Sequence, residues 1–150
     1  MKAGNWFFDL VLAGSLWAWA GCTADPPRYE AVARIGYRYA STDMKFEAGF
    51  LREETFLKIV FDQLSDTELR EFAEPPGARP TGDAKRELFR QFVHGAYSRP
   101  GKKNREIEVC VSHANAGVAV SLANHIADTY LSVRGDQAYL ITRAAAAKKP

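Results

Sequence analysis

Alternation of apolar and polar residues predicts three strands in this chain. The clearest run covers residues 29–39, in which every second position is apolar or aromatic: Tyr29, Ala31, Ala33, Ile35, Tyr37 and Tyr39. Residues 105–112 repeat the pattern, and residues 137–143 form a third run. Because successive side chains of a strand point to opposite faces, each predicted strand has one buried face and one solvated face.

Apolar residues at helical spacing predict helices between these strands. After the turn at residues 41–43, one helix carries the stripe Phe50, Leu57, Phe61 and Leu64. Ser65 and Glu68 have the spacing of a capping box, which starts a short second helix through Phe72. The three prolines and two glycines of residues 75–82 exclude a helix there and predict a surface loop.

Two further helices follow. Asp83 can cap a helix that ends near Gly95, with Leu88, Phe89, Phe92 and Val93 as its apolar stripe. Asn115 is the expected N-cap of a longer helix that ends at Arg134 and Gly135. The buried stripe of this longer helix is predicted to be Val118, Ala119, Leu122, Ala123, Ile126 and Tyr130.

The order strand, helices, strand, helix, strand predicts an α+β domain over residues 29–143. A helical crossover joins the last two strands, so they should lie parallel, and the first strand could fill the gap between them, antiparallel to both. We therefore expect a small three-stranded mixed sheet, similar to a split βαβ unit, with helices packed on one face. Residues 144–150 are expected to form a frayed tail.

Residues 1–22 have the character of a targeting or anchoring segment. Lys2 precedes a long apolar stretch, of which residues 10–22 fit a secretory signal, whereas residues 3–22 could just span a membrane if Asp9 is tolerated near the interface. Trp19-Ala20-Gly21-Cys22 also resembles a lipoprotein cleavage box, which would place a lipid on Cys22. Lipidation, an uncleaved membrane helix and ordinary signal cleavage therefore remain alternatives.

All three alternatives place the chain after Asp25 outside the cytoplasm, in the cell envelope. Residues 23–28 contain Pro26-Pro27 and read as a short stiff linker between the anchor and the domain. Cys22 would then lie in the membrane or carry a lipid, so a disulfide with Cys110 is not expected. Cys110 alternates with valines in a predicted strand and is interpreted as a packed thiol.

Composition supports one globular domain and argues against nucleic acid as a partner. The 150 residues are 47% hydrophobic and 25% charged, which is ordinary for one domain. The net charge of +2 is small and its cations are scattered, although residues 99–105 are locally basic.

Candidate chemistry in the sequence is sparse. His125 and Asp128 are three residues apart on one helix, where the carboxylate could orient the imidazole. No nucleophile follows a recognisable pattern, and no third ligand completes a metal site. His113 and Asn115 at a strand end and helix start, and His94 at a helix end, are explained by capping. We therefore expect no catalytic residue, no cofactor site and no metal site.

Four segments are similar, in the same order, to a known family. They are PPRYEAVARI, FLREETFLKIVFDQLSDTELREFAE, RPGKKNREIEVCVSHANAGVAVSLANHIADTYL and AYLITRAAAAKKP. The third contains an Ala-Asn-x-x-Ala-x-x-Tyr pattern formed by Ala123, Asn124, Ala127 and Tyr130. Together they resemble the Wzz-type chain-length determinants, or polysaccharide co-polymerases, of bacterial surface polysaccharide export.

The resemblance implies a structural, non-enzymatic role for this domain. It places Asn124, Asp128 and Tyr130 on a structural helix of a membrane-proximal domain, with small alanines that let the helix lie close to the sheet. The chain passes from Tyr130 to its last strand in a few residues, so the expected form is a minimal domain without the family's long helical arm or second membrane helix.

We accordingly expect a membrane-anchored, extracytoplasmic module that assists control of polysaccharide chain length, assembly or export. Its expected partners are the membrane and polysaccharide polymerase or export proteins, with further copies of itself, in a homo-oligomer, as another option. One alternative is a generic lipoprotein that binds a small ligand or cell-wall component near the aromatic residues Phe46, Phe50, Phe56, Phe61 and Tyr97. Another alternative is an exported hydrolase that uses His125 and Asp128.

Overall fold

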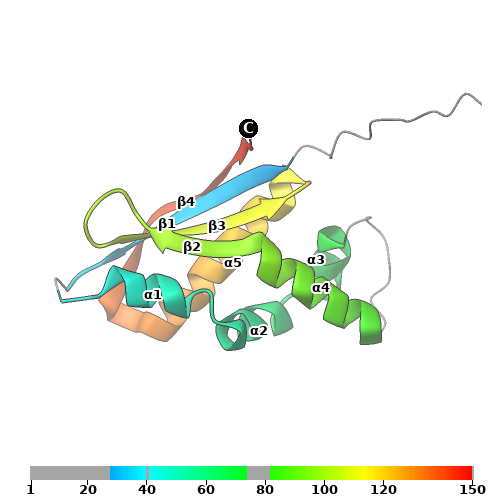
Figure 1. The fold of residues 1–150 in the computed structure, drawn as a ribbon, viewed down its shortest axis with the longest axis horizontal. Helices are drawn as coiled ribbons and strands as arrows, with labels where there is room; N and C mark the ends of the chain where they lie inside the picture. The colour runs from blue at the N-terminus through cyan, green and yellow to red at the C-terminus, as the bar shows by residue number, and fades with distance from the viewer. Residues whose placement is uncertain (1–27, 40, 74–81, 150) are drawn as a thin grey trace, which may run out of the picture.

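The computed structural model describes residues 28–39, 41–73 and 82–149, which form a four-stranded sheet and five α-helices (Figure 1). The strands are β1 (Tyr29–Tyr37), β2 (Ala96–Pro100), β3 (Glu106–His113) and β4 (Ala138–Lys148). The helices are α1 (Met44–Phe50), α2 (Glu54–Asp62), α3 (Asp66–Phe72), α4 (Gly82–Gly95) and α5 (Ala116–Arg134), followed by the short 3-10 turn η1 (Gly135–Gln137).

The expected three-stranded mixed sheet is wrong. The sheet has the order β2-β3-β1-β4, and every neighbouring pair is antiparallel. The missed strand is β2, which has only five residues and includes Ser98 and Pro100. Such a short segment shows no clear alternation, and it becomes a strand because the turn after Pro100 folds it back onto β3 as a hairpin.

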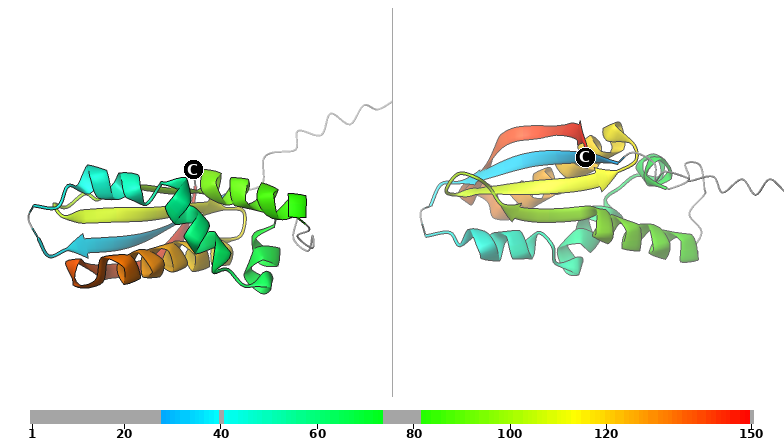
Figure 2. Two further views of the ribbon diagram at one scale, coloured as in Figure 1. Left: turned by 90° about the horizontal axis from the view of Figure 1, so that it is seen from below. Right: turned by 45° about the horizontal axis from the view of Figure 1, so that its top comes forward.

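The α+β class and the central position of β1 agree with the pattern of the sequence. β1 lies between β3 and β4 and is antiparallel to both. In the sheet, β3 lies between β1 and β2. Along the chain, the elements follow the β-α-β-β-α-β order called ferredoxin-like, here with four helices between β1 and β2. The helices lie together against one face of the sheet (Figure 2), so the other face carries no helix among the described residues.

The single helix expected before Ser65 is divided into α1 and α2. Residues 51–53 separate the two, and the aromatic side chain of Phe46 on α1 is 64% exposed. The division lets α1 pack on β2 and β3 while α2 packs on α4 and α5. The expected capping box of α3 is confirmed, because the Ser65 and Glu68 side chains each bind the other residue's backbone amide.

The last strand is longer than the alternation predicts. β4 continues to Lys148, and its residues 145–148 pair with residues 29–32 of β1, where a frayed tail was expected. Alanine has little intrinsic preference for strands, so it is the pairing with β1 that extends β4. Asn124 on α5 supports this segment, because its Oδ1 atom accepts a hydrogen bond from the Ala144 amide at 2.8 Å, beside a register shift in the β1–β4 pairing.

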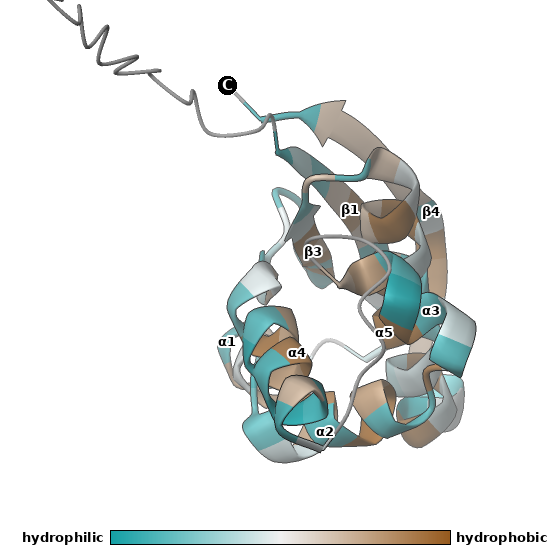
Figure 3. Ribbon diagram, turned by 90° about the vertical axis from the view of Figure 1, so that its right-hand side faces the viewer, coloured by the Kyte–Doolittle hydropathy of each residue, from teal (hydrophilic) through white to brown (hydrophobic). Residues whose placement is uncertain are grey.

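Helix α5 packs against the centre of the sheet in the expected way. Asn115 caps it by accepting hydrogen bonds from the amides of Gly117 and Val118. The three alanines on its inner face are fully buried and allow close contact with the strands: Ala119, Ala123 and Ala127. Brown apolar ribbon on α5 faces the inside of the molecule (Figure 3). None of the helices in the described ranges is long and apolar enough to cross a membrane.

A buried polar cluster connects α1, β1 and α5. Glu47 on α1 and Arg134 at the end of α5 form an ion pair with an N–O distance of 2.5 Å, and both side chains are largely buried. The Tyr130 hydroxyl donates to Glu47 and also contacts the Tyr37 hydroxyl. The Arg134 guanidinium lies 4.8 Å from the centre of the Phe50 ring, a favourable cation–π arrangement.

Burial of this cluster keeps the tyrosines neutral. Removal from water, and then the hydrogen bond to Tyr130, raise the pKa of Tyr37 far above its ordinary value. Burial is also the main cause that raises the pKa of Tyr130 to about 12. The two phenols therefore serve as neutral hydrogen-bond partners beside the Glu47–Arg134 ion pair.

We expect Arg134→Ala to destabilise the fold by about 2–3 kcal/mol, because it leaves the Glu47 carboxylate buried without its cation. Adding Glu47→Gln to this variant should recover part of the loss, since the unpaired charge is then removed. Urea denaturation of the full chain measures both effects. Arg143→Ala is the matched control: its ion pair with Asp128 is about half exposed on both sides, so its loss should be below about 1 kcal/mol. Equal losses for the two arginines would contradict a special role of the buried pair.

Candidate functional site

The histidine and aspartate considered for catalysis do not act on each other. The Asp128 carboxylate binds Arg143 on β4 at 2.6 Å, which ties α5 to the edge of the sheet. The Nε2 atom of His125 is buried and has no hydrogen-bond partner among the described residues. The structure therefore does not assemble the relay that a hydrolase would need from these two side chains.

His113 is a structural residue. Its side chain is buried, its Nδ1 atom accepts a hydrogen bond from the Asn115 amide at 2.9 Å, and its Nε2 atom donates to the Phe72 carbonyl oxygen at 3.0 Å. The ring thus connects the end of β3 with the end of α3 and the start of α5. His94 is exposed in the last turn of α4. Capping and packing contacts account for His113 and Asn115, as the sequence suggested, and the capping role of His94 stays a prediction.

Cys110 is fully buried on the side of the sheet that carries no helix. It lies between Val32 and Tyr97, its partners on the two neighbouring strands. Burial raises the pKa of its thiol to about 12, so the thiolate needed for nucleophilic attack is absent near neutral pH. No group of three or more metal-binding side chains occurs in the part of the chain that the structure describes.

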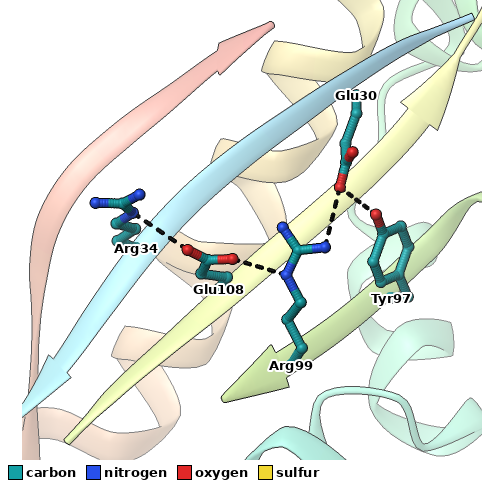
Figure 4. A network of polar contacts seen from close by, with 5 residues as sticks. All are labelled: Glu30, Arg34, Tyr97, Arg99 and Glu108. Carbon is teal, nitrogen blue, oxygen red and sulfur yellow. Dashed lines mark hydrogen bonds and ion pairs between the residues drawn. The ribbon is translucent and has the colours of Figure 1, made fainter. Parts of the chain in front are cut away.

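The helix-free face of the sheet is covered by a chain of ion pairs and hydrogen bonds (Figure 4). Glu108 on β3 is at its centre: its carboxylate lies 3.4 Å from Arg34 Nε on β1 and 2.7 Å from Arg99 Nε on β2. Arg99 also lies 3.5 Å from Glu30, which accepts a hydrogen bond from the Tyr97 hydroxyl. We call these five residues the sheet-face network.

The sheet-face network explains how charged residues cover an open face. The arginines are about half exposed, but they shield Glu108, of which only 4% is exposed. The pKa of Arg99 is raised, and the largest cause is the hydrogen bond that Arg99 donates to Glu108. Alternation predicted that this face would be polar, but the pairing across three strands depends on the register. These charges neutralise one another, so the network stabilises the sheet and provides no free group for catalysis.

Two depressions lie at opposite ends of the sheet. One, of about 540 Å³, is at the end where β1 begins and β4 finishes, and is lined by Phe72, Gln91, His94, Tyr97, Ser112 and neighbouring residues. The other, of about 510 Å³, lies beside the turn between β2 and β3 and is lined by Asp43, Met44, Lys45, Pro100, Gly101 and residues 103–106. We call the end of the sheet that carries the second depression the hairpin end.

The aromatic residues named for the generic-lipoprotein alternative lie in different parts of the described structure. Phe56 and Phe61 are buried in the core, where they contact other aromatic rings. Phe50 packs on Phe56, and Phe46 is exposed. Tyr97 belongs to the sheet-face network on β2. These residues therefore do not surround one common cavity.

Cys22, the predicted lipidation site, and the rest of the anchoring segment lie outside the described residues. No protein-family model matches the chain, and no curated protein matches it with significance. The assignment of function therefore depends on the residues and contacts described above.

We expect Cys110 to resist alkylation in the folded protein. Its thiol is buried and stays protonated up to a pH near its raised pKa, so iodoacetamide at pH 8 should leave it unmodified. In 8 M urea the thiol returns to its ordinary pKa and should react within minutes. Mass spectrometry of the peptide that contains Cys110 distinguishes it from Cys22. Rapid modification without urea would contradict the buried, neutral state.

Proposed function

We propose that this chain is a membrane-anchored, extracytoplasmic interaction module that assists chain-length control, assembly or export of a surface polysaccharide. The observation that carries the proposal is the position of the two described ends of the domain. The Lys149 amide donates a hydrogen bond to the Arg28 carbonyl oxygen at 2.8 Å, so the chain enters and leaves at the same side. This arrangement suits a domain that stands on a membrane at one end.

The resemblance to Wzz-type proteins is supported by where its motifs fall. PPRYEAVARI leads into β1, and the third segment covers the β2–β3 turn, β3 and α5. Asn124 and Asp128 hold α5 to β4, and Tyr130 lies in the buried cluster. These are packing roles of the kind that the resemblance implies for this helix.

The proposed mechanism is tethering without chemistry. An anchor at or before Cys22 confines the domain to the plane of the membrane, and this raises its effective concentration for polymerase or export proteins in that plane. Self-association of the domain would act in the same way. A non-enzymatic role fits the engagement of Asp128 and His113 in structural contacts and the protonated state of Cys110.

Deletion of the gene in its native host tests this proposal. We expect the length distribution or the exported amount of a surface polysaccharide to change, as measured by gel electrophoresis of the extracted polymer. The intact chain and a His125→Ala variant should both restore it, because no step uses that imidazole. An unchanged polymer in the deletion strain would reject the proposal, and failure of His125→Ala alone would favour the hydrolase alternative.

The nature of the anchor is tested by mass spectrometry of the mature N-terminus. A diacylglyceryl group on Cys22 is expected for a lipoprotein, and Cys22→Ser should then release the protein from the membrane fraction. An intact Met1 would instead identify a spanning helix. Release of a soluble mature chain in the native host would contradict membrane tethering.

A further inference from the structure

We propose that the hairpin end binds an acidic polysaccharide through a cluster of exposed cations. This inference rests on the proposed function and names the class of polymer that the domain contacts. Five residues define the cluster, which we call the hairpin-end patch: Arg38, Lys45, Lys102, Lys103 and Arg105.

The charges of the hairpin-end patch are exposed and not neutralised. All five side chains are exposed, and none lies within ion-pair distance of a carboxylate among the described residues. Elsewhere the chain pairs many of its cations, including Arg34 and Arg99 of the sheet-face network and Arg134 of the buried cluster. This end therefore holds five exposed cations without ion pairs, in a molecule whose formal net charge is only +2.

The patch surrounds a shaped site. Lys45, Lys103 and Arg105 line the depression of about 510 Å³ between the start of α1 and the β2–β3 turn. Two carboxylates share the lining. Asp43 caps α1, accepting hydrogen bonds from the amides of Lys45 and Phe46, and Glu106 lies at the start of β3 with its Cβ close to Gly101. The lining therefore carries three cations against two carboxylates, and Arg38 and Lys102 of the patch add further positive charge.

The backbone holds these cations in place. The Gly101 amide bonds to the Glu106 carbonyl oxygen at 2.7 Å and closes the turn, and the Tyr37 amide bonds to the Arg105 carbonyl oxygen at 3.0 Å. Arg105 has a φ of 67°, a left-handed conformation that is unfavourable for a residue with a side chain. Its side chain is exposed and makes no ion pair among the described residues, so packing does not explain why an arginine stands there.

A sugar polymer fits this end better than a membrane does. The hairpin end lies at the opposite end of the sheet from Arg28, the first described residue after the proposed anchor (Figure 1), so a domain tethered there points this end away from the lipid. Two exposed aromatic side chains are close to the patch in the chain, Tyr39 at 57% and Phe46 at 64% exposure. Their rings offer surfaces for the apolar faces of sugar rings, while lysine and arginine bind carboxylate groups.

The test measures binding of the full-length chain in detergent to polygalacturonate, with neutral dextran as the comparison polymer. We expect binding to polygalacturonate at low ionic strength that falls as salt is added, and none to dextran. The triple variant Lys45→Glu, Lys103→Glu and Arg105→Glu should weaken it by about tenfold or more. The matched control is Arg70→Glu, Lys85→Glu and Arg86→Glu, which changes the net charge equally on exposed residues of α3 and α4 and should bind like the unmodified chain.

Circular dichroism confirms that each variant is folded. A conservative variant, Lys45→Gln with Lys103→Gln, reduces the charge without repulsion and should give an intermediate loss. Equal weakening by both triple variants, no binding to polygalacturonate, or patch-dependent binding to anionic vesicles alone would each overturn the inference. Because binding is measured with purified components, its failure leaves the polysaccharide phenotype of the deletion strain as a separate result.

Discussion

The buried ion pair between Glu47 and Arg134 is the interaction on which the arrangement of this domain depends. It joins α1, the first helix after β1, to the last residue of α5, and the hydroxyls of Tyr37 and Tyr130 complete its hydrogen bonds. Both crossovers of the ferredoxin-like sheet are thereby fixed together on one face. A buried charge is unfavourable without its partner, so the two helices can occupy only those positions in which the pair is formed.

The charged side chains outside this cluster include two contrasting groups, one joined in ion pairs and the other exposed without them. In the sheet-face network, Glu108 is shielded by Arg34 and Arg99, so the open face of the sheet is held in register and is nearly neutral. At the hairpin end, cations from three connected segments stay exposed without carboxylate partners. The first arrangement stabilises the fold, whereas the second forms the surface that we propose for an acidic polymer.

The two ends of the domain therefore differ in what they present. The backbone bond between Lys149 and Arg28 brings the two described ends of the chain to one side of the sheet, and the hairpin end lies on the other. A domain tethered through the segment before Arg28 presents its hairpin end to the space outside the membrane. The proposed role in polysaccharide assembly and the proposed contact with an acidic polymer follow from that orientation, and neither needs a catalytic group.

Some of the structure could be predicted from local sequence. The alternation in residues 29–39 and 105–112 identified β1 and β3, and Ser65 with Glu68, and Asn115, identified the starts of α3 and α5. These signals are local: a strand buries every second side chain, and a cap needs only its own helix. The same reasoning correctly interpreted Cys110 as packed and His113 as structural.

What the sequence could not determine depends on contacts between distant residues. β2 and the second half of β4 have weak strand patterns and exist because β3 and β1 supply their hydrogen bonds. The division of α1 from α2, the partner of Asp128 and the shielding of Glu108 likewise depend on which elements become neighbours. The sequence by itself determined the central strands, the caps of α3 and α5 and the polar character of the open sheet face, whereas Asp83, expected to cap α4, lies inside the first turn of that helix. Only the tertiary structure decided which charges are paired and which remain exposed, because pairing is set by distances across strands and helices.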